Sequence, residues 1–297
     1  MPDIVRPLRD IFFWTKYVPY ILCFLFPSSV FADTLIGGDT FYSVVKGDTL
    51  QLIGAKLGVN WSNLVRENKI DIKKNLKIGQ EIRTNNRKIV PGTTQNGIII
   101  NIPDRMLYLF REGKLIISVP VGLGKPTWKT PEGKFAVTAK EKNPTWYVPE
   151  SIREEMEMNG EMVKTVVPPG PDNPLGRYAV KTSMQGILIH ETIWPMSVYQ
   201  FRSHGCIRVL PRDMEKFFSE VAKNMSGEIV YNPVKIAVTE NGRIFLEVHR
   251  DIYGKMKDLN GEAKQLIGIK GYTNRVDWKK VEKIVKDKSG IAEDITL

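Results

Sequence analysis

The most reactive residue types in this chain are gathered near Cys206. This cysteine belongs to the run Ser203-His204-Gly205-Cys206-Ile207-Arg208, and His190 ends an apolar stretch sixteen residues earlier. A free thiol has a pKa of about 8.5, so nucleophilic catalysis requires a neighbour that accepts its proton or stabilises the thiolate. These residues therefore indicate a cysteine nucleophile with a histidine as its base.

The residues on either side of Cys206 suit such a site. His204 lies two residues before the cysteine, and on a strand residues two apart share a face. Arg208 lies two residues after it and adds positive charge. Gly205 allows backbone N–H groups to approach a substrate oxygen, as an oxyanion site requires. The spacing thus predicts a nucleophile, a cation and an oxyanion site within one short segment.

The chain holds three histidines, at positions 190, 204 and 249. A histidine that ends a buried strand is often only a hydrogen-bonded core residue, and we interpret His249, on an expected late strand, in that way. His190 follows the apolar run 186–189, which would hold its ring rigidly. Because His190 and His204 both fall within sixteen residues of Cys206, we expect both to be functional.

The N-terminal residues 1–32 resemble a secretory signal. Arg6, Arg9 and Lys16 precede the short apolar stretch 17–26, and small residues follow up to Ala32. An uncleaved membrane anchor is the alternative, although a spanning helix needs about 20 apolar residues. Cys23 lies inside this segment, so Cys206 is the only thiol of the mature chain. A disulfide within one mature chain is therefore excluded.

The composition is that of an ordinary soluble globular protein, with a basic surplus. Of 297 residues, 42% are hydrophobic and 26% charged, and the formal net charge is +10. The expected signal holds three positive and two negative residues, so the mature chain keeps about +9. This charge favours anionic surfaces, including nucleic acid, phospholipid and carboxylate-rich cell wall, or it is only a solvated surface. Export argues against nucleic acid as a partner.

Residues 40–84 predict a small strand–helix–helix–strand unit. Residues 41–45 alternate like a strand, and Gly47, Asp48 and Thr49 supply a turn and a helix cap. The unit resembles a LysM module, a family that binds glycans containing N-acetylglucosamine. The residues that carry this resemblance are Tyr42, Val44, Gly47, Asp48, Thr49, Leu50, Ile53, Gly58, Val59, Leu64, Asn68, Ile70, Gly79 and Gln80. Residues 85–96 are expected to form a polar linker.

Residues 97–234 predict a mostly β domain. Short apolar or alternating runs at 98–102, 106–110, 114–121, 133–139 and 187–190 are separated by turn residues. This pattern favours a sandwich or barrel with few helices, near 151–158 and 211–224. The remaining residues, 235–297, are expected to form a C-terminal extension with a strand at 244–248 and a helix at 277–286. We predict a packing appendage or a basic surface there.

The segment 97–234 resembles the L,D-transpeptidase catalytic domain, also called YkuD-type. Its signature is a histidine on a strand, about fifteen residues, and then Ser/Thr-His-Gly-Cys, a hydrophobic residue and Arg or Asn. Here it reads Ile189-His190-Glu191-Thr192 and Ser203-His204-Gly205-Cys206-Ile207-Arg208; Pro120-Val121-Gly122, Thr130-Pro131-Glu132-Gly133, Pro144-Thr145-Trp146 and the run 168–176 also match. The set resembles the periplasmic branch found in Gram-negative bacteria. Glu191 stands where the family commonly has glycine.

The resemblance implies a role for each site residue. Cys206 would attack the L-centre carbonyl of diaminopimelate in a tetrapeptide stem of peptidoglycan, releasing D-alanine. His190 would act as general base and acid, oriented by the backbone carbonyl of Glu191. The N–H groups of Gly205 and Cys206, with His204, would hold the oxyanion, and Ser203 and Arg208 would shape the site and contact substrate carboxylates. The family requires no metal and no cofactor.

Several functions stay open beyond this resemblance. The acyl acceptor could be an amine of a second stem peptide, which gives a cross-link, or an envelope lipoprotein, which gives an anchor. Water as acceptor would make the protein an L,D-carboxypeptidase. The chain could instead be a non-catalytic cell-wall-binding protein or a papain-like cell-wall endopeptidase. Papain-like enzymes usually place cysteine before histidine, whereas here His190 precedes Cys206. The expected partners are peptidoglycan stem peptides and glycan strands, in the periplasm.

Overall fold

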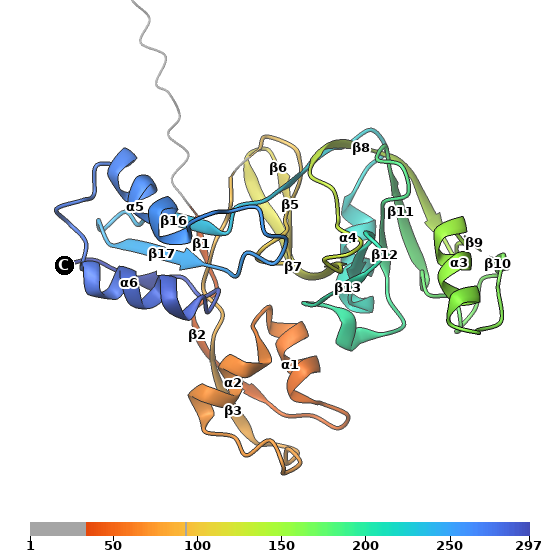
Figure 1. Ribbon diagram of the computed structural model, residues 1–297, viewed down its shortest axis with the longest axis horizontal. Coiled ribbons are helices and arrows are strands. Elements are labelled where there is room, and N and C mark those ends of the chain that lie inside the picture. Colours follow the sequence, from red (N-terminus) through yellow and green to blue (C-terminus); the bar gives the residue numbers. More distant parts are fainter. Residues whose placement is uncertain (1–33, 93) are drawn as a thin grey trace, which may run out of the picture. The chain divides into compact units, whose positions relative to one another are not determined.

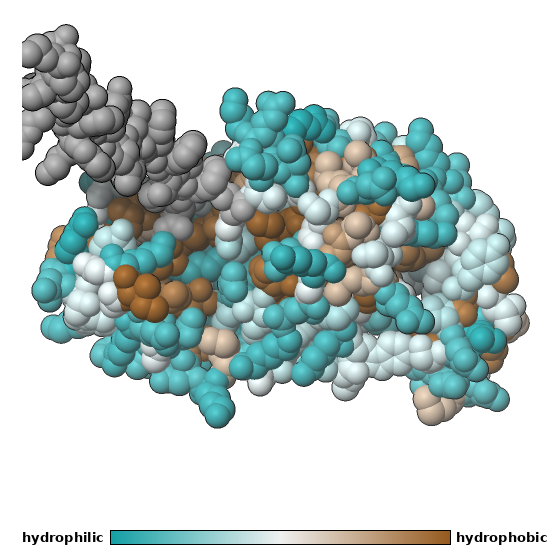
Figure 2. Space-filling model, turned by 90° about the horizontal axis from the view of Figure 1, so that it is seen from above, coloured by the Kyte–Doolittle hydropathy of each residue, from teal (hydrophilic) through white to brown (hydrophobic). Residues whose placement is uncertain are grey.

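The computed structural model describes residues 34–92 and 94–297 (Figure 1). The expected signal, residues 1–32, lies outside the described residues. Among the residues that the structure describes, no helix is both long and apolar enough to span a membrane. These described residues belong to one compact unit by their contacts. The face seen in Figure 2 is mostly hydrophilic, with apolar residues in separate areas between hydrophilic ones.

The predicted strand–helix–helix–strand unit lies near the N-terminal end of the described residues and is drawn in orange in Figure 1. Its two strands pair antiparallel, with Tyr42 opposite Ile82. The side chain of Thr49 accepts a hydrogen bond from Leu52 N and so caps the first helix, as the sequence predicted. The elements are β2 (Asp39–Ser43), α1 (Leu50–Leu57), α2 (Trp61–Asn68) and β3 (Glu81–Asn85).

The segment after this unit is partly buried. β1 (Leu35–Ile36) pairs with β4 (Lys88–Ile89), within the expected linker 85–96. Lys88, Ile89 and Val90 are all buried. The segment that connects the first unit to the rest of the chain is therefore packed against the protein.

A sheet of nine strands forms the centre of the molecule. The strand order is β13-β7-β14-β12-β11-β8-β15-β5-β6, and β7 also pairs with β6, so the sheet closes into a barrel-like form. The strands are β5 (Gly97–Asn101), β6 (Met106–Arg111), β7 (Lys114–Gly124), β8 (Gly133–Lys142), β11 (Tyr178–Thr182), β12 (Leu188–Glu191), β13 (Phe201–Ser203), β14 (Ile207–Val209) and β15 (Ser226–Val230). This confirms the expected mainly β class, with a small α+β unit before it.

Apolar side chains from these strands fill the main core. Helix α4 (Pro211–Glu220) covers part of it with Met214 and Phe217, which are fully buried. The sequence predicted this helix to run to residue 224. It ends earlier because Val221 adopts an extended backbone conformation.

Between β8 and β11 the chain forms a flap, residues 144–175. Figure 1 shows its helix and two short strands together beside β11 and β12. Asn173 is fully buried, and its Nδ2 donates to the carbonyl oxygens of Pro144 and Val167, which closes the base of the flap. The flap elements are β9 (Trp146–Tyr147), α3 (Glu150–Met158) and β10 (Val166–Val167).

The C-terminal extension folds around a core of its own. The predicted strand at 244–248 and helix at 277–286 are confirmed, whereas α5 was not predicted. Leu259, Ala263 and Ile267 of α5 are buried in this second core, against the three-stranded sheet. The elements are β16 (Val234–Val238), β17 (Ile244–Val248), α5 (Leu259–Ile269), α6 (Trp278–Asp287) and β18 (Glu293–Asp294).

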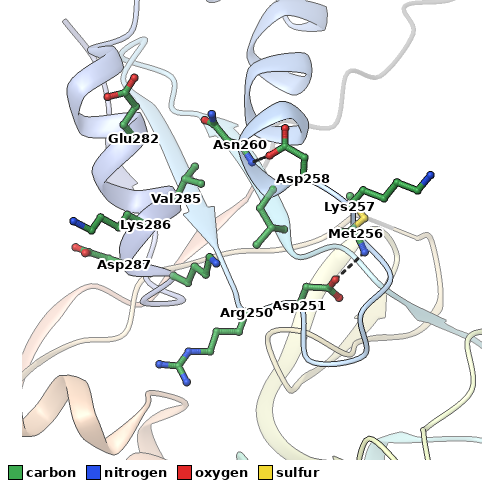
Figure 3. A pocket seen from close by; sticks show the side chains of 12 residues that line it. Arg250, Asp251, Met256, Lys257, Asp258, Asn260, Glu282, Val285, Lys286 and Asp287 are labelled. Carbon is green, nitrogen blue, oxygen red and sulfur yellow. Dashed lines mark hydrogen bonds between the residues drawn. The ribbon is translucent and has the colours of Figure 1, made fainter.

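The extension carries an open groove of about 910 Å³. Figure 3 shows Glu282, Val285 and Lys286 of α6 on one side and Asp258 and Asn260 on the other. Basic and acidic side chains are mixed along this groove. Its charge therefore favours neither an anionic nor a cationic ligand.

Candidate active site

Cys206 lies at a turn between two strands of the central sheet. β13 ends at Ser203 and β14 begins at Ile207, so residues 204–206 belong to neither strand. Gly205 has φ +103, a conformation that disfavours any residue with a side chain. We expected His204 and Cys206 to share a face, as residues two apart on a strand do, but the chain turns at Gly205 and neither residue lies on a strand.

The turn is held by hydrogen bonds to its backbone. Ser203 Oγ donates to Cys206 O at 2.6 Å and accepts from Gly205 N at 3.2 Å. Thr130 Oγ1 donates to Gly205 O at 2.8 Å. The carbonyl oxygens of Gly205 and Cys206 are therefore both engaged. Ser203, the last residue of β13, thus holds the turn that carries Cys206.

His190 stands on β12, next to the strand that follows Cys206. β12 and β14 pair in parallel, with His190 opposite Arg208. Cys206 comes from the turn directly before β14, two residues from Arg208. All three line a single pocket of about 1010 Å³, together with Ser203 and His204.

The imidazole of His190 is buried and has one fixed nitrogen. Its Nδ1 lies 2.6 Å from the backbone oxygen of Glu191, so Nδ1 carries the proton and donates it to that carbonyl. Burial lowers the pKa of His190 to about 4, helped by the charge of Arg208 and opposed by this hydrogen bond. At neutral pH the ring is therefore neutral, with Nε2 able to accept a proton.

The thiol of Cys206 is also held in its neutral form. Burial raises the pKa of Cys206, and this outweighs the hydrogen bond from the Leu188 backbone and the charge of Arg208, which both lower it. Cys206 Sγ also lies 3.4 Å from Gly186 O, to which it can donate. The resting site therefore holds a neutral thiol and a neutral imidazole in one pocket.

Glu191 does not line the pocket. Its carboxylate is buried and accepts a hydrogen bond from Arg177 Nε at 3.2 Å. A side chain at Gly176 would meet Glu191, because a Cβ there would lie 2.7 Å from Glu191 Cβ. The side chain therefore packs outside the pocket, and only its backbone oxygen reaches His190.

His204 has partners that no short motif predicts. Its Nε2 is hydrogen-bonded to the carboxylate of Glu155 on α3, and its ring meets the edge of Trp128, with centroids 4.4 Å apart. Glu155 also accepts from Lys125 Nζ at 2.8 Å, and this cation, followed by His204, lowers the pKa of the Glu155 carboxyl. The flap is thus tied directly to the turn that carries Cys206. The contact between Glu155 and His204 is seen only in the folded structure, where the flap brings Glu155 to His204.

Arg208 and Trp194 form one wall of the pocket. The Arg208 guanidinium carbon lies 5.5 Å from the centre of the Trp194 ring, within the range of a cation–π contact. Burial lowers the pKa of Arg208, yet an arginine stays protonated at any ordinary pH. The wall therefore offers a positive charge, close to the thiol, to a carboxylate that enters the pocket.

A cluster with metal-ligating side chains lies elsewhere among the described residues. Asp104, Glu247 and His249 are buried together. The ammonium group of Lys235 lies among them, 2.6 Å from Asp104 Oδ2 and 3.1 Å from Glu247 Oε1. His249 Nε2 is 2.6 Å from Glu247 Oε1, which agrees with its interpretation as a core histidine. The ammonium group of Lys235 thus occupies the position that a metal ion would take.

Two family models match separate parts of the chain. Residues 95–236 match the L,D-transpeptidase catalytic domain, and residues 42–85 match the LysM domain. These boundaries nearly coincide with those of the two resemblances seen in the sequence. The pocket lies within the first of these matches.

Two curated relatives match this chain over most of their length. Probable L,D-transpeptidase YcfS of Escherichia coli K12 is 30% identical over 230 residues, which is 75% of this chain and 72% of the relative. Probable L,D-transpeptidase ErfK/SrfK of Salmonella typhimurium is 27% identical over 93% of both chains. Among solved structures, the E. faecium L,D-transpeptidase catalytic domain acylated by ertapenem is 23% identical. It aligns with a TM-score of 0.37, over 47% of this chain and 100% of that one.

Proposed function

We propose that this chain, which belongs to the L,D-transpeptidase family, transfers peptidoglycan stem peptides through a thioester on Cys206. The observation that carries this proposal is the state of His190. Its Nδ1 is committed to the Glu191 carbonyl, and its neutral Nε2 is available in the pocket that contains the thiol. This is the arrangement that a general base for a cysteine nucleophile requires.

The first half-reaction forms the thioester. His190 Nε2 accepts the thiol proton as Cys206 Sγ bonds to the carbonyl carbon of the diaminopimelate L-centre. The negative charge that develops on the carbonyl oxygen is held by the Cys206 N–H, with His204 nearby, because the Gly205 N–H already donates to Ser203 Oγ. The carbon–nitrogen bond then breaks, and His190 returns its proton to the amine of the leaving D-alanine.

The second half-reaction transfers the acyl group to an amine. The acceptor amine attacks the thioester carbon and loses a proton to His190, and the carbon–sulfur bond breaks. The proton then returns to the Cys206 sulfur, which restores the starting site. The side-chain amine of a second stem peptide would give a cross-link, and a lysine of an envelope lipoprotein would give an anchor. The steps use only groups of this chain and the substrates.

We propose that Arg208 binds the substrate, whereas Ser203 holds the turn that carries Cys206. Arg208 lines the pocket, and its charge would attract the carboxylates of the stem peptide. Ser203 Oγ is already engaged with the Cys206 carbonyl, so it acts by holding the turn. The LysM domain, residues 42–85, would bind glycan strands of the same polymer and so bring stem peptides near the pocket.

We infer export to the periplasm from residues 1–32 and from the substrate class. Peptidoglycan lies outside the cytoplasmic membrane, so the signal-like segment and the proposed substrate agree. Fractionation of cells that produce the full chain tests this inference. The protein should appear in the periplasmic fraction, and a cytoplasmic location would contradict it.

The decisive assay is incubation of the purified protein with sacculi rich in tetrapeptide stems. The protein should release D-alanine and form new muropeptides that mass spectrometry detects. Cys206→Ala should do neither, and His190→Gln should lower the rate by about 10²-fold or more, as expected for loss of a general base. His249→Gln is the matched control, because it alters a buried histidine outside the pocket.

The products of this assay distinguish the possible functions. Full activity of Cys206→Ala would overturn the thioester mechanism, and absence of activity in the wild-type protein would favour a cell-wall-binding function. Release of D-alanine without any new amide bond would identify an L,D-carboxypeptidase. A parallel reaction with a lysine-bearing lipoprotein shows whether that acceptor competes with a second stem peptide.

A further inference from the structure

Tyr253 belongs to the C-terminal extension but is packed into the core of the central sheet. It lies between β17 and α5, is 5% exposed, and is buried among residues of the barrel. Its ring meets that of Phe201 on β13, with centroids 5.7 Å apart. A residue outside the family match of 95–236 therefore contributes to the packing of the catalytic domain.

The hydroxyl of Tyr253 joins the two ends of the segment 124–130. It donates to Gly124 O at 2.7 Å and accepts from Thr130 N at 3.1 Å. Within the same segment, Gly124 N donates to Thr130 Oγ1 at 2.9 Å. Gly124 has no room for a side chain, because an added Cβ would lie 2.2 Å from Trp128 O. One phenol group thus fixes where the Thr130 hydroxyl stands.

Thr130 in turn fixes the peptide bond that precedes Cys206. Its Oγ1 donates to Gly205 O at 2.8 Å. In a trans peptide the carbonyl of one residue and the N–H of the next point in opposite directions. Holding Gly205 O against Thr130 therefore aims the N–H of Cys206 the other way. That N–H is one of the donors that the proposed reaction needs for the oxyanion.

We propose that Tyr253 is a positioning residue for catalysis, which holds the Cys206 N–H in the oxyanion orientation through Thr130 and Gly205. This inference rests on the proposed function and deepens it. It assigns the C-terminal extension a part in the reaction, where the sequence alone predicted only a packing appendage or a basic surface. Tyr253 acts through two other residues and does not contact the substrate.

The surroundings of Tyr253 hold it firmly in this position. Tyr253 N donates to Tyr231 OH at 3.0 Å, and Tyr231 is hydrogen-bonded to Asp251. Lys129 Nζ donates to Tyr253 O at 3.0 Å, directly beside Thr130. Burial also raises the pKa of Tyr253, so its hydroxyl remains a donor throughout the pH range of enzyme assays.

A purely structural role would give a different result from a positioning role. Loss of oxyanion alignment slows acyl transfer, in which a carbonyl oxygen becomes negative. It leaves alkylation of Cys206 by iodoacetamide unchanged, because the sulfur displaces iodide from the CH2 carbon of the reagent and no oxyanion develops. Loss of general packing would instead lower thermal stability and alter both reactions. The ratio of the two rates therefore separates the roles.

The test compares Tyr253→Phe with Tyr108→Phe in the full chain. Tyr108 is a buried tyrosine whose hydroxyl donates to Asp104 at 3.1 Å outside the pocket, so it controls for loss of one buried hydrogen bond. With a stem tetrapeptide as donor, Tyr253→Phe should lower kcat for D-alanine release about tenfold, somewhat less than loss of an oxyanion donor itself. KM and the iodoacetamide rate should stay within about twofold of wild type, because neither depends on charge that develops at the carbonyl oxygen.

Thr130 provides a second, independent variant pair. Thr130→Val removes the hydroxyl and should lower kcat at least as much as Tyr253→Phe, whereas Thr130→Ser should restore most of it. Equal kcat for Tyr253→Phe and Tyr108→Phe would overturn the inference, as would a parallel loss of iodoacetamide reactivity. If the wild-type protein releases no D-alanine, the proposed function fails, and this inference fails with it.

Discussion

The carboxylate of Glu191 is bound to Arg177 and turned away from the catalytic pocket. Arg177 Nε lies 3.2 Å from Glu191 Oε1, and the Glu191 side chain is only 7% exposed, whereas that of Arg177 is 53% exposed. Position 191, where the resemblance seen in the sequence led us to expect glycine, thus accommodates a charge by pairing it outside the pocket. The backbone oxygen of Glu191 remains free to receive His190 Nδ1.

Removal of Arg177 should therefore reduce stability by leaving a buried charge without its partner. We expect Arg177→Gln to lower the free energy of unfolding by about 1–3 kcal/mol, because an unsatisfied buried group bears its desolvation cost. Glu191→Gln in the same background should recover part of that loss, since a neutral amide no longer needs a cation. Urea denaturation of the two single variants and the double variant measures the coupling; additive effects would contradict the pairing.

The sequence predicted the local features of the site and missed the long-range ones. His190 on a strand and the Ser203–Cys206 run follow from short motifs, and the structure brings His190, His204, Cys206 and Arg208 to one pocket. Glu155, by contrast, lies 49 positions away from its partner His204. Tyr253 lies beyond the end of the catalytic family match. Glu155 and Tyr253 reach the site only when the flap and the C-terminal extension pack against the central sheet, so their spacing in the sequence does not predict these contacts.

The fold was predicted where the pattern was regular. The strands β5, β6, β7, β8 and β12 and the helix α6 stand out by alternation or by helical spacing with a capping Asp277, whereas β11, β13, β14 and β15 were not predicted. The helix α5 was missed although Asp258 caps it and its apolar residues recur at helical spacing, because Gly261 and Gly268 weaken the helical pattern. The closing of the sheet by β7 depends on pairings that the sequence does not show.

The pH dependence of D-alanine release and of alkylation should show that His190 and Cys206 are both neutral at neutral pH. Since the pKa of His190 is about 4, the base stays unprotonated to well below neutral pH, and D-alanine release should persist near pH 5. Since the pKa of Cys206 is raised, the rate of iodoacetamide alkylation should be low at pH 6. It should increase only at a higher pH than for an ordinary cysteine. Stopped assays across about pH 4–10 measure both. Rapid alkylation at pH 6 would indicate a thiolate–imidazolium pair instead.

The contact between Glu155 and His204 should affect turnover more than stability. Glu155→Ala removes the acceptor that fixes the His204 ring and releases α3 from Lys125, so we expect kcat to fall about tenfold through loss of alignment. Glu154→Ala is the matched control, because Glu154 is an exposed neighbour on the same helix and does not line the pocket. Equal kcat values for the two variants would show that the flap contact has no part in the reaction.

Acid should destabilise the protein before its carboxyl groups titrate. His190 and His249 have pKa values of about 4 in the folded chain, against about 6.5 in an unfolded one. Below pH 6.5 the unfolded chain therefore binds protons that the folded chain does not, so stability falls as the pH decreases from about 6.5 to about 4. Each histidine can contribute up to about 3 kcal/mol over this window.

Replacement of one buried histidine should reduce this sensitivity to acid. His249→Gln cannot gain a proton, and its amide can still donate to Glu247, which His249 Nε2 approaches at 2.6 Å. We expect the loss of unfolding free energy between pH 7 and pH 5 to be smaller in this variant than in the wild-type protein, although its stability at pH 7 is lower. Urea denaturation at the two pH values measures the difference. An identical loss in both proteins would mean that His249 is protonated in the folded state, because then the folded and unfolded chains bind the same proton.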